Sequence, residues 1–343
     1  LAGTRMSITT AIGGTRYGTG PIIIGQSPTD KAGIFFSTVA NTLSNPIIFN
    51  TAQGNDRVGI RTDVAGIVLS GPITSNLAPA TFTTNSSGSF TLTNQVTGAF
   101  GLVVDITSLG AAATGLTVSL SNPAGTNDYQ GDTVINFNPA SGKLATLQLL
   151  AADQIPNGSG KGNVLVNSNG SGIGLLSLAG GNETINGLSG NGNVASTTGT
   201  VTLTLGDNNA TASHSGAINN TEGTLSLTKI GTGIQTLSGI SNFGGVVTVT
   251  GGLLAFPSSA ATAGPLGNST AVNLNGGGIS YTASGSNALN RPIAIGASIG
   301  LSRGRLDGSD NRISTVLLRQ ADISMNAAKT QMTVVNATVM SSD

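Results

Sequence analysis

Short runs in which apolar and polar residues alternate recur along the chain. They include VTLTL (201–205), LSLT (225–228), VVTVT (246–250), AVNLN (271–275) and MTVVNATVM (332–340). A period of two is typical of β-strands with one buried and one exposed face. Clusters such as LSGNGN, GDNNAT, INNTEG and NGGG separate the runs and predict turns. The pattern therefore predicts an all-β protein made of many short strands.

One segment is ambiguous at this level. The leucines of GKLATLQLLAADQIP (142–156) suit a helix or a strand equally well. Helical periodicity with capping residues is otherwise almost missing from the chain, so this segment does not change the predicted fold class.

The polar residues favour a parallel β-solenoid over an antiparallel sandwich. Coils of a solenoid stack about 4.8 Å apart, so like side chains lie above like. Asn, Thr, Val and Gly tolerate such stacking, whereas stacked charges repel one another. Only four charged residues occur in 171–290, against eight in 1–63, six in 64–170 and ten in 291–343. The middle of the chain therefore satisfies the electrostatic requirement of a solenoid.

Composition narrows the class of protein further. Charged residues are 8% of the 343 residues and aromatic residues 3%, while glycine reaches 51 residues and the formal net charge is zero. Average soluble domains are roughly one quarter charged. With no basic stripe to neutralise phosphates, nucleic acid is not an expected partner. No apolar run approaches the roughly 20 residues of a membrane-spanning helix, so no membrane span is expected.

Two pairs of segments repeat each other imperfectly. LTVSLSNPAGTNDYQGDTVIN (116–136) resembles IQTLSGISNFGGVVTVT (234–250), each with a strand, a polar turn, an aromatic residue (Tyr129 or Phe243) and a β-branched strand. NTLSNPIIFN (41–50) likewise resembles NALNRPIAIG (287–296). Such echoes are expected when turns vary in length around a fixed coil.

An ordered series of residues runs through GTLSLTKIGTGIQTLSGISNFGGVVTVTGGLLAF (223–256). Its members are Leu227, Lys229, Gly231, Gly233, Leu237, Gly239, Phe243, Gly244 and Gly252 to Leu254. The series resembles the autotransporter-associated β-strand repeat, also called the passenger-associated transport repeat. The resemblance is good over about 116–290 and weaker over 41–115. We expect Lys229 to lie beside a strand at a turn, in a structural role.

The resemblance implies a secreted, right-handed β-helical stalk or passenger on a bacterial surface. The C-terminal membrane barrel of autotransporters is not seen in this sequence, so export through an attached barrel does not follow. We expect a solenoid body over 41–296. Non-repeat capping or assembly segments are expected over 1–40 and 297–343.

Candidate catalytic and metal-binding residues are few. His214 is the single histidine, and a Ser-His-Asp triad would need it as the base, with Asp207 nearby in sequence. No Gly-x-Ser-x-Gly motif accompanies it, so a strand residue that replaces an aromatic ring is the favoured interpretation. Three oxygen-rich turns could bind calcium but are better explained as solvated turns. Their residues are Asn127, Asp128 and Asp132; Asp207, Asn208 and Asn209; and Asp307, Asp310 and Asn311.

A β-helical glycan-active enzyme is the main enzymatic alternative. Such enzymes need two or three acids on one face, and aromatic platforms for the sugar. Glu183, Asp207 and Glu222 are the only acids in 171–290, and the chain contains no tryptophan. We therefore predict no enzymatic activity and no catalytic, cofactor-binding or metal-binding residues.

The leading functional hypothesis is a structural subunit of an extracellular bacterial surface fibre, which assembles with itself through its ends. We expect the tail (330–343) or PIIIG (21–25) to pair with the next subunit, and deletion of the tail to abolish polymers. Five arginines near the C-terminus could meet acids of a neighbour: Arg291, Arg303, Arg305, Arg312 and Arg319. The alternative is a monomeric adhesin, or autotransporter-type passenger, that binds host or matrix glycans.

Overall fold

The protein is all-β and forms two compact units. The computed structural model describes residues 4–9, 18–51, 59–106, 115–137, 143–257, 264–282, 286–288, 292–296, 322–325, 331–335 and 338–340. All the regular elements in these residues are β-strands. Unit 1 is Leu1–Glu183 and unit 2 is Thr184–Asp343. Within the described ranges, no helix is long and apolar enough to span a membrane.

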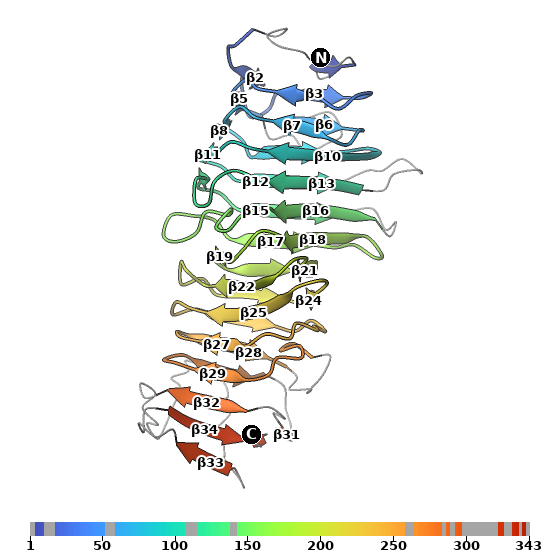
Figure 1. Ribbon diagram of the computed structural model, residues 1–343. Helices are drawn as coiled ribbons and strands as arrows, with labels where there is room; N and C mark the ends of the chain where they lie inside the picture. The colour runs from blue at the N-terminus through green and yellow to red at the C-terminus, as the bar shows by residue number, and fades with distance from the viewer. Residues whose placement is uncertain are drawn as a thin grey trace. The chain divides into compact units, whose positions relative to one another are not determined.

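Unit 1 winds through three parallel sheets, with successive strands lying in sheets A, C and B in turn (Figure 1). Sheet A consists of β1 (Thr4–Ile8), β3 (Ala32–Phe36), β6 (Gly59–Thr62), β9 (Ala80–Thr83), β12 (Leu102–Ile106), β15 (Thr133–Phe137) and β17 (Val164–Asn167). Sheet B consists of β2 (Ile22–Ile24), β5 (Ile47–Phe49), β8 (Ile73–Ser75), β11 (Val96–Gly98) and β14 (Asp128–Tyr129). Sheet C consists of β4 (Thr42–Leu43), β7 (Ile67–Leu69), β10 (Ser87–Leu92), β13 (Gly115–Leu120), β16 (Leu144–Leu149) and β18 (Ile173–Leu178). This arrangement confirms the predicted parallel β-solenoid.

Like residues stack on like in the core of unit 1. The last residue of each strand of sheet C is a buried leucine, and each pairs in register with the next. The ladder comprises Leu43, Leu69, Leu92, Leu120, Leu149 and Leu178, all at most 1% exposed. Burying one leucine contributes about 1.5–3 kcal/mol, so this ladder is a major stabilising element.

Coil length varies although register is kept. Ala80 pairs with Leu102, 22 residues later, and Leu102 pairs with Thr133, 31 residues later. The additional residues lie in turns, where insertions disturb little of the sheet. This variation explains why the repeats in the sequence are imperfect.

Aromatic side chains also fill the core of unit 1. Phe82 lies between Phe90 and Phe49, with ring centroids 5.3 Å and 6.2 Å away, and Phe36 lies 6.2 Å from Phe90. All four rings are fully buried. Tilted and edge-to-face pairs of this kind are favourable beyond the area that they bury.

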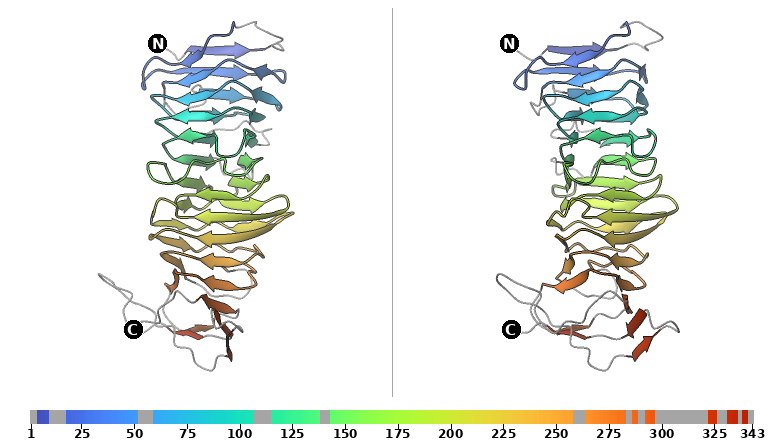
Figure 2. Two further views of the ribbon diagram at one scale, coloured as in Figure 1. Left: turned by 60° about the vertical axis from the view of Figure 1, so that its left-hand side comes forward. Right: turned by 90° about the vertical axis from the view of Figure 1, so that its left-hand side faces the viewer.

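Unit 2 also winds through parallel sheets, here named D, E and F; its coils are yellow to orange in Figure 2. Sheet D consists of β20 (Leu188–Gly190), β23 (Ala212–His214), β26 (Ile234–Leu237), β28 (Leu253–Phe256) and β30 (Gly278–Tyr281). In sheet E, β22 (Thr200–Leu205), β25 (Thr224–Lys229), β27 (Val247–Val249), β29 (Val272–Leu274) and β32 (Ile293–Gly296) follow one another. Sheet F contains β21 (Asn193–Ser196) and β24 (Ile218–Asn220), and β19 (Glu183–Ile185) spans the boundary between the units in sequence.

Sheet E changes from parallel to antiparallel pairing near the C-terminus. The strand β34 (Gln331–Val335) pairs antiparallel with β32 on one edge and with β33 (Asp322–Met325) on the other. A separate antiparallel pair joins β31 (Ser286–Ala288) to β35 (Thr338–Met340). The predicted strand MTVVNATVM is thus divided between two sheets.

The structure decides the conformation of the ambiguous segment 142–156. It also shows that one pair of similar sequences does not occupy equivalent positions. Within GKLATLQLLAADQIP, residues 144–149 form strand β16, so the helical alternative is wrong. The echo of 116–136 in 234–250 does not mark equivalent positions in the coil. Its first copy contains β13, β14 and β15, whereas its second contains only β26 and β27. TVTLTL and TLSLTK, by contrast, are equivalent in the coil, because they pair in register over all six residues of β22 and β25.

Candidate functional site

His214 is a core residue of unit 2. It ends β23, is fully buried, and pairs in register with Leu237. Its Nδ1 lies 3.4 Å from the carbonyl oxygen of Ser189, and its Nε2 has no hydrogen-bond partner among the described residues. Burial lowers the pKa of His214 to about 4, although the contact with Ser189 raises it. A triad base needs a carboxylate on one nitrogen and a nucleophile on the other, so the interpretation as a strand residue is confirmed.

Asp207 and Glu222, both in unit 2, are not brought together. Asp207 lies two residues after the end of β22, while Glu222 lies two residues before the start of β25. These strands are parallel and in register over six residues, so the two acids lie at opposite ends of the sheet. Six residues of strand span about 20 Å, whereas glycoside-cleaving carboxylates lie about 5–10 Å apart.

Glu183, the third acid proposed for glycan chemistry, is buried in unit 1. Only 1% of it is exposed, and its two carboxylate oxygens accept hydrogen bonds from the backbone N–H groups of Gln154 (2.9 Å) and Ile155 (2.7 Å). A residue in this position holds a turn of the chain and does not face a substrate.

In the described oxygen-rich turns, side-chain oxygens bind other groups of the protein. Asp128 forms an ion pair with Lys161, and Asp132 accepts a hydrogen bond of 2.7 Å from the backbone N–H of Asn163. Asn209 Oδ1 accepts one of 2.9 Å from the N–H of Thr232. Across the described residues, no group of three or more metal-ligating side chains occurs. The third predicted turn, with Asp307, Asp310 and Asn311, lies outside these residues.

Lys229 is buried, contrary to the expectation of a place beside a strand. It is the last residue of β25, and it stacks between Leu205 and Val249 in a ladder that is otherwise apolar. Its ammonium group donates hydrogen bonds to three backbone carbonyls, those of Ile230, Gly231 (3.1 Å) and Gly251 (3.4 Å). Burial lowers the pKa of Lys229. The carbonyls replace the water lost on burial, so its role is structural.

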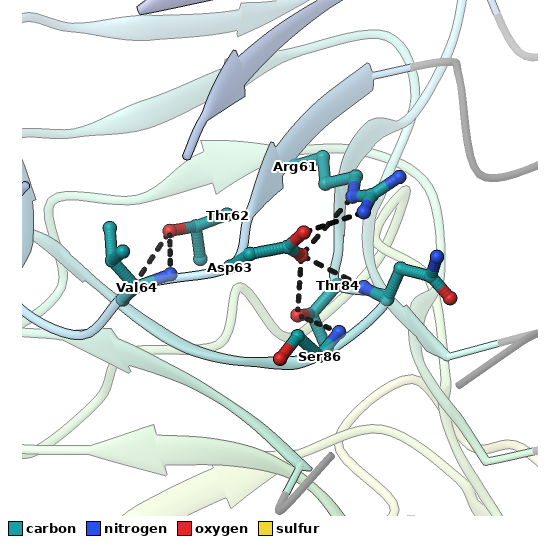
Figure 3. A network of polar contacts seen from close by, with 7 residues as sticks. Arg61, Thr62, Asp63, Val64, Thr84 and Ser86 are labelled. Atoms are coloured by element: carbon teal, nitrogen blue, oxygen red, sulfur yellow. Dashed lines mark hydrogen bonds and ion pairs between the residues drawn. The ribbon is translucent and has the colours of Figure 1, made fainter. Parts of the chain in front are cut away.

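The Arg61–Asp63 pair is a polar cluster that the sequence did not single out (Figure 3). Arg61 donates to both oxygens of Asp63, at 2.6 Å and 3.2 Å. The Oδ1 atom of Asp63 also accepts from the Thr84 hydroxyl (3.3 Å) and the Asn85 N–H (3.1 Å). Arg61 in turn lies 4.6 Å above the ring of Phe35 on the neighbouring strand.

A groove of about 350 Å³ lies beside this cluster and combines Asp63 with hydroxyl-bearing residues that include Ser87, Thr117 and Thr146. The carboxylate of Asp63 is fully engaged by its partners. General acid–base chemistry needs a group that is free to exchange a proton with a substrate. The cluster therefore stabilises a turn and does not define a catalytic centre.

The strand β2 of unit 1 lies inside PIIIG, one of the two segments predicted to mediate assembly. It is the last strand of sheet B. Ile22 donates its N–H to Pro46 (2.8 Å), and Ile24 accepts from the N–H of Asn50 (2.9 Å). Because strand residues alternate in direction, the N–H and C=O groups of Ile23 face the other edge. The Ile23 side chain is 55% exposed. This edge of β2 is the candidate assembly site.

The tail, the other predicted assembly segment, contributes β34 to the middle of a sheet in its own chain, between β32 and β33. The five arginines proposed to accompany it lie outside the described residues, as does Lys329. The tail also contributes β35, which pairs only with β31 among the described strands, so each predicted segment has a strand with one edge unpaired in the described part of the chain.

Comparisons with protein-family models, with curated proteins and with solved structures found no match.

Proposed function

We propose that the chain is a structural subunit of an extracellular bacterial surface fibre, assembled through the ends of its solenoid. No described strand pairs with the outer edge of β2, and this open edge is the observation that carries the proposal. An edge strand with unpaired backbone groups is a template for strand addition by a second molecule. The resemblance to the autotransporter-associated β-strand repeat supports a place on the bacterial surface.

Features of the coils support a structural role. Their core is held by ladders of identical residues, and their polar residues form ladders too. Asn167 donates to Asn136 across neighbouring strands (2.8 Å), and Asn76 donates to Asn50 (2.8 Å). Stacked amides of this kind stabilise parallel, in-register strands without bringing like charges together.

Substitution of Ile23 tests the proposal. Ile23→Pro removes the N–H that faces the open edge, but it spares the hydrogen bonds that Ile22 and Ile24 make to the next coil. We expect the unmodified chain to form regular polymers under negative stain, and Ile23→Pro to shorten or abolish them.

Ile23→Val is the matched control, because it keeps both the N–H and a β-branched side chain. It should polymerise like the parent, and circular dichroism should show that all three proteins contain the same amount of β-structure. Polymers of Ile23→Pro as long as those of the parent would contradict an assembly role for β2. Single particles of the parent at every concentration would contradict the fibre itself.

A monomeric adhesin that binds glycans is the second candidate. The observation that favours it is the outer face of sheet E, where hydroxyl-bearing residues pair in register across strands. The pairs are Thr200 with Thr224, Thr202 with Ser226, Thr204 with Thr228, and Thr228 with Thr248. Such an uncharged hydroxyl surface could hydrogen-bond sugars. Single particles in the same micrographs would favour this candidate.

A further inference from the structure

Sheet B of unit 1 ends at β14. A buried polar cluster occupies the corresponding place in the next coil. In the next coil the chain leaves β16 at Leu149 and reaches β17 at Val164 without forming a strand of sheet B. A turn around Asp153 takes that place, and Asp153 adopts the left-handed conformation with φ of 48°. Polar side chains from the coils on either side hold this turn.

On one side, residues that follow β13 bind the turn. Asn127 donates to the backbone carbonyl of Gln154 (2.7 Å), and the side-chain amide of Gln154 donates to the carbonyl of Asn122 (3.1 Å). On the other side, Glu183 accepts from the N–H groups of Gln154 and Ile155. The turn is thus held between Asn127 and Glu183.

Two features of this cluster are unusual for a protein core. Glu183 is 1% exposed, yet no cation pairs with it in the described part of the chain. The Oε1 atom of Gln154 is also fully buried and has no hydrogen-bond partner. An unpaired buried carboxylate and an unsatisfied buried acceptor are each costly. A proton on Glu183 would remove the cost of the buried charge.

We propose that Glu183 is a neutral carboxylic acid in the folded protein and acts as a proton-dependent latch on the turn 152–155. Its neutral carboxyl group accepts hydrogen bonds from the backbone N–H groups of Gln154 and Ile155. When the proton passes to solvent at alkaline pH, the buried group becomes an unpaired anion and the turn is released.

The groups around Glu183 agree with a neutral acid. Burial raises the pKa of Glu183 to about 8, two backbone N–H groups lower it, and the carboxylate of Asp153 raises it. Tyr129 on β14 faces the same cluster, and burial raises the pKa of its hydroxyl, so it stays neutral as well. Lys161, the cation paired with β14, binds the exposed Asp128 and not Glu183.

The sign of the pH effect follows from linkage. The ordinary pKa of a glutamate is 4.5 and that of folded Glu183 is about 8. The folded state therefore binds the extra proton between these values, and stability is lost as pH rises through the folded pKa.

Hydrogen exchange of the Gln154 and Ile155 amides tests the latch. After correction for intrinsic rates, we expect protection in the full chain to fall about tenfold or more between about pH 6 and about pH 9. Glu183→Gln should abolish this pH dependence, since its side-chain amide is neutral at any pH. Infrared spectroscopy of the parent should show a protonated carboxyl band at about pH 6 that Glu183→Gln lacks.

Asp153→Asn is the matched variant, because asparagine tolerates the left-handed conformation and removes only the neighbouring charge. It should keep the pH-dependent loss of protection but move its midpoint to lower pH, because the anion that raises the pKa of Glu183 is gone. Protection that is independent of pH in the parent, or the absence of the protonated carboxyl band, would overturn the proposal. If Glu183→Gln does not fold, the parent and Asp153→Asn still decide the question.

Discussion

Buried polar side chains in this protein replace backbone partners. Gln235 in β26 is 1% exposed and binds Leu188 as another peptide group would, donating to its carbonyl at 2.9 Å and accepting from its N–H at 3.1 Å. Lys229 caps carbonyls in the same way at a turn. Each side chain supplies a hydrogen bond where the spacing of neighbouring coils leaves a backbone group without one. These residues therefore belong to the fold, although their types would suggest a binding site.

His214 makes the stability of unit 2 depend on pH. Its ordinary pKa is 6.5 and its folded pKa is about 4, so the unfolded chain binds the proton first as pH falls. Stability is present above pH 6.5 and is lost as pH falls through about 4. We expect protonation of His214 to lower the free energy of unfolding by on the order of 3 kcal/mol over that pH range.

His214→Leu should remove that dependence, because leucine stands at the register partner, position 237. Urea unfolding of both proteins at neutral and acidic pH provides the measurement. The parent should lose more stability than His214→Leu at acidic pH. Equal losses would show that His214 is not buried as a neutral ring.

At the scale of elements, glycines set how closely successive turns approach. A Cβ atom built on Gly239 would lie 1.9 Å from the carbonyl oxygen of Gly216, one coil away. Only a residue without a side chain permits this backbone contact. Gly239, a member of the ordered series over 223–256, is therefore explained by the close stacking of successive coils.

Gly239→Ala should destabilise unit 2 by about 2 kcal/mol or more, because a backbone segment must move to admit the methyl group. Gly20→Ala is the control, since a Cβ atom there has no neighbour within 4 Å. It should change stability by less than about 0.5 kcal/mol. Thermal unfolding of the two variants beside the parent measures both effects. Similar melting temperatures for the two variants would contradict close stacking at Gly239.

At the scale of the whole molecule, electrostatics contributes little to stability. The chain has 14 basic and 14 acidic residues among 343. The described ion pairs, Arg61–Asp63 and Lys161–Asp128, join residues of the same or adjacent coils of unit 1. Stability comes instead from apolar ladders and backbone hydrogen bonds, which salt hardly screens.

We therefore expect stability to respond weakly to salt. Raising NaCl from about 0.1 M to about 1 M shortens the screening length from about 10 Å to about 3 Å. The free energy of unfolding should change by less than about 1 kcal/mol, because exposed ion pairs contribute little. Urea titrations at the two salt concentrations measure this change. A large loss of stability in high salt would point to an ion-pair network beyond the described residues.

The sequence by itself determined the fold class. Alternation with a period of two predicted the strands, and sparse charge with abundant Asn and Thr favoured stacked coils over a sandwich. Both signals are local or compositional, so they can be read without knowing which segments meet. The leucine ladder of sheet C and the paired β22 and β25 confirm that interpretation.

Only the tertiary structure decided which polar residues are buried and which strand edge is open. Glu183, Gln154 and Lys229 are residue types usually found at the surface, and their partners lie in the same turn or in a coil 22 to 32 residues away. Because turns differ in length from coil to coil, sequence spacing does not reveal those partners. That β2 is the last strand of sheet B, whereas β34 lies between two strands, likewise became clear only from the pairing.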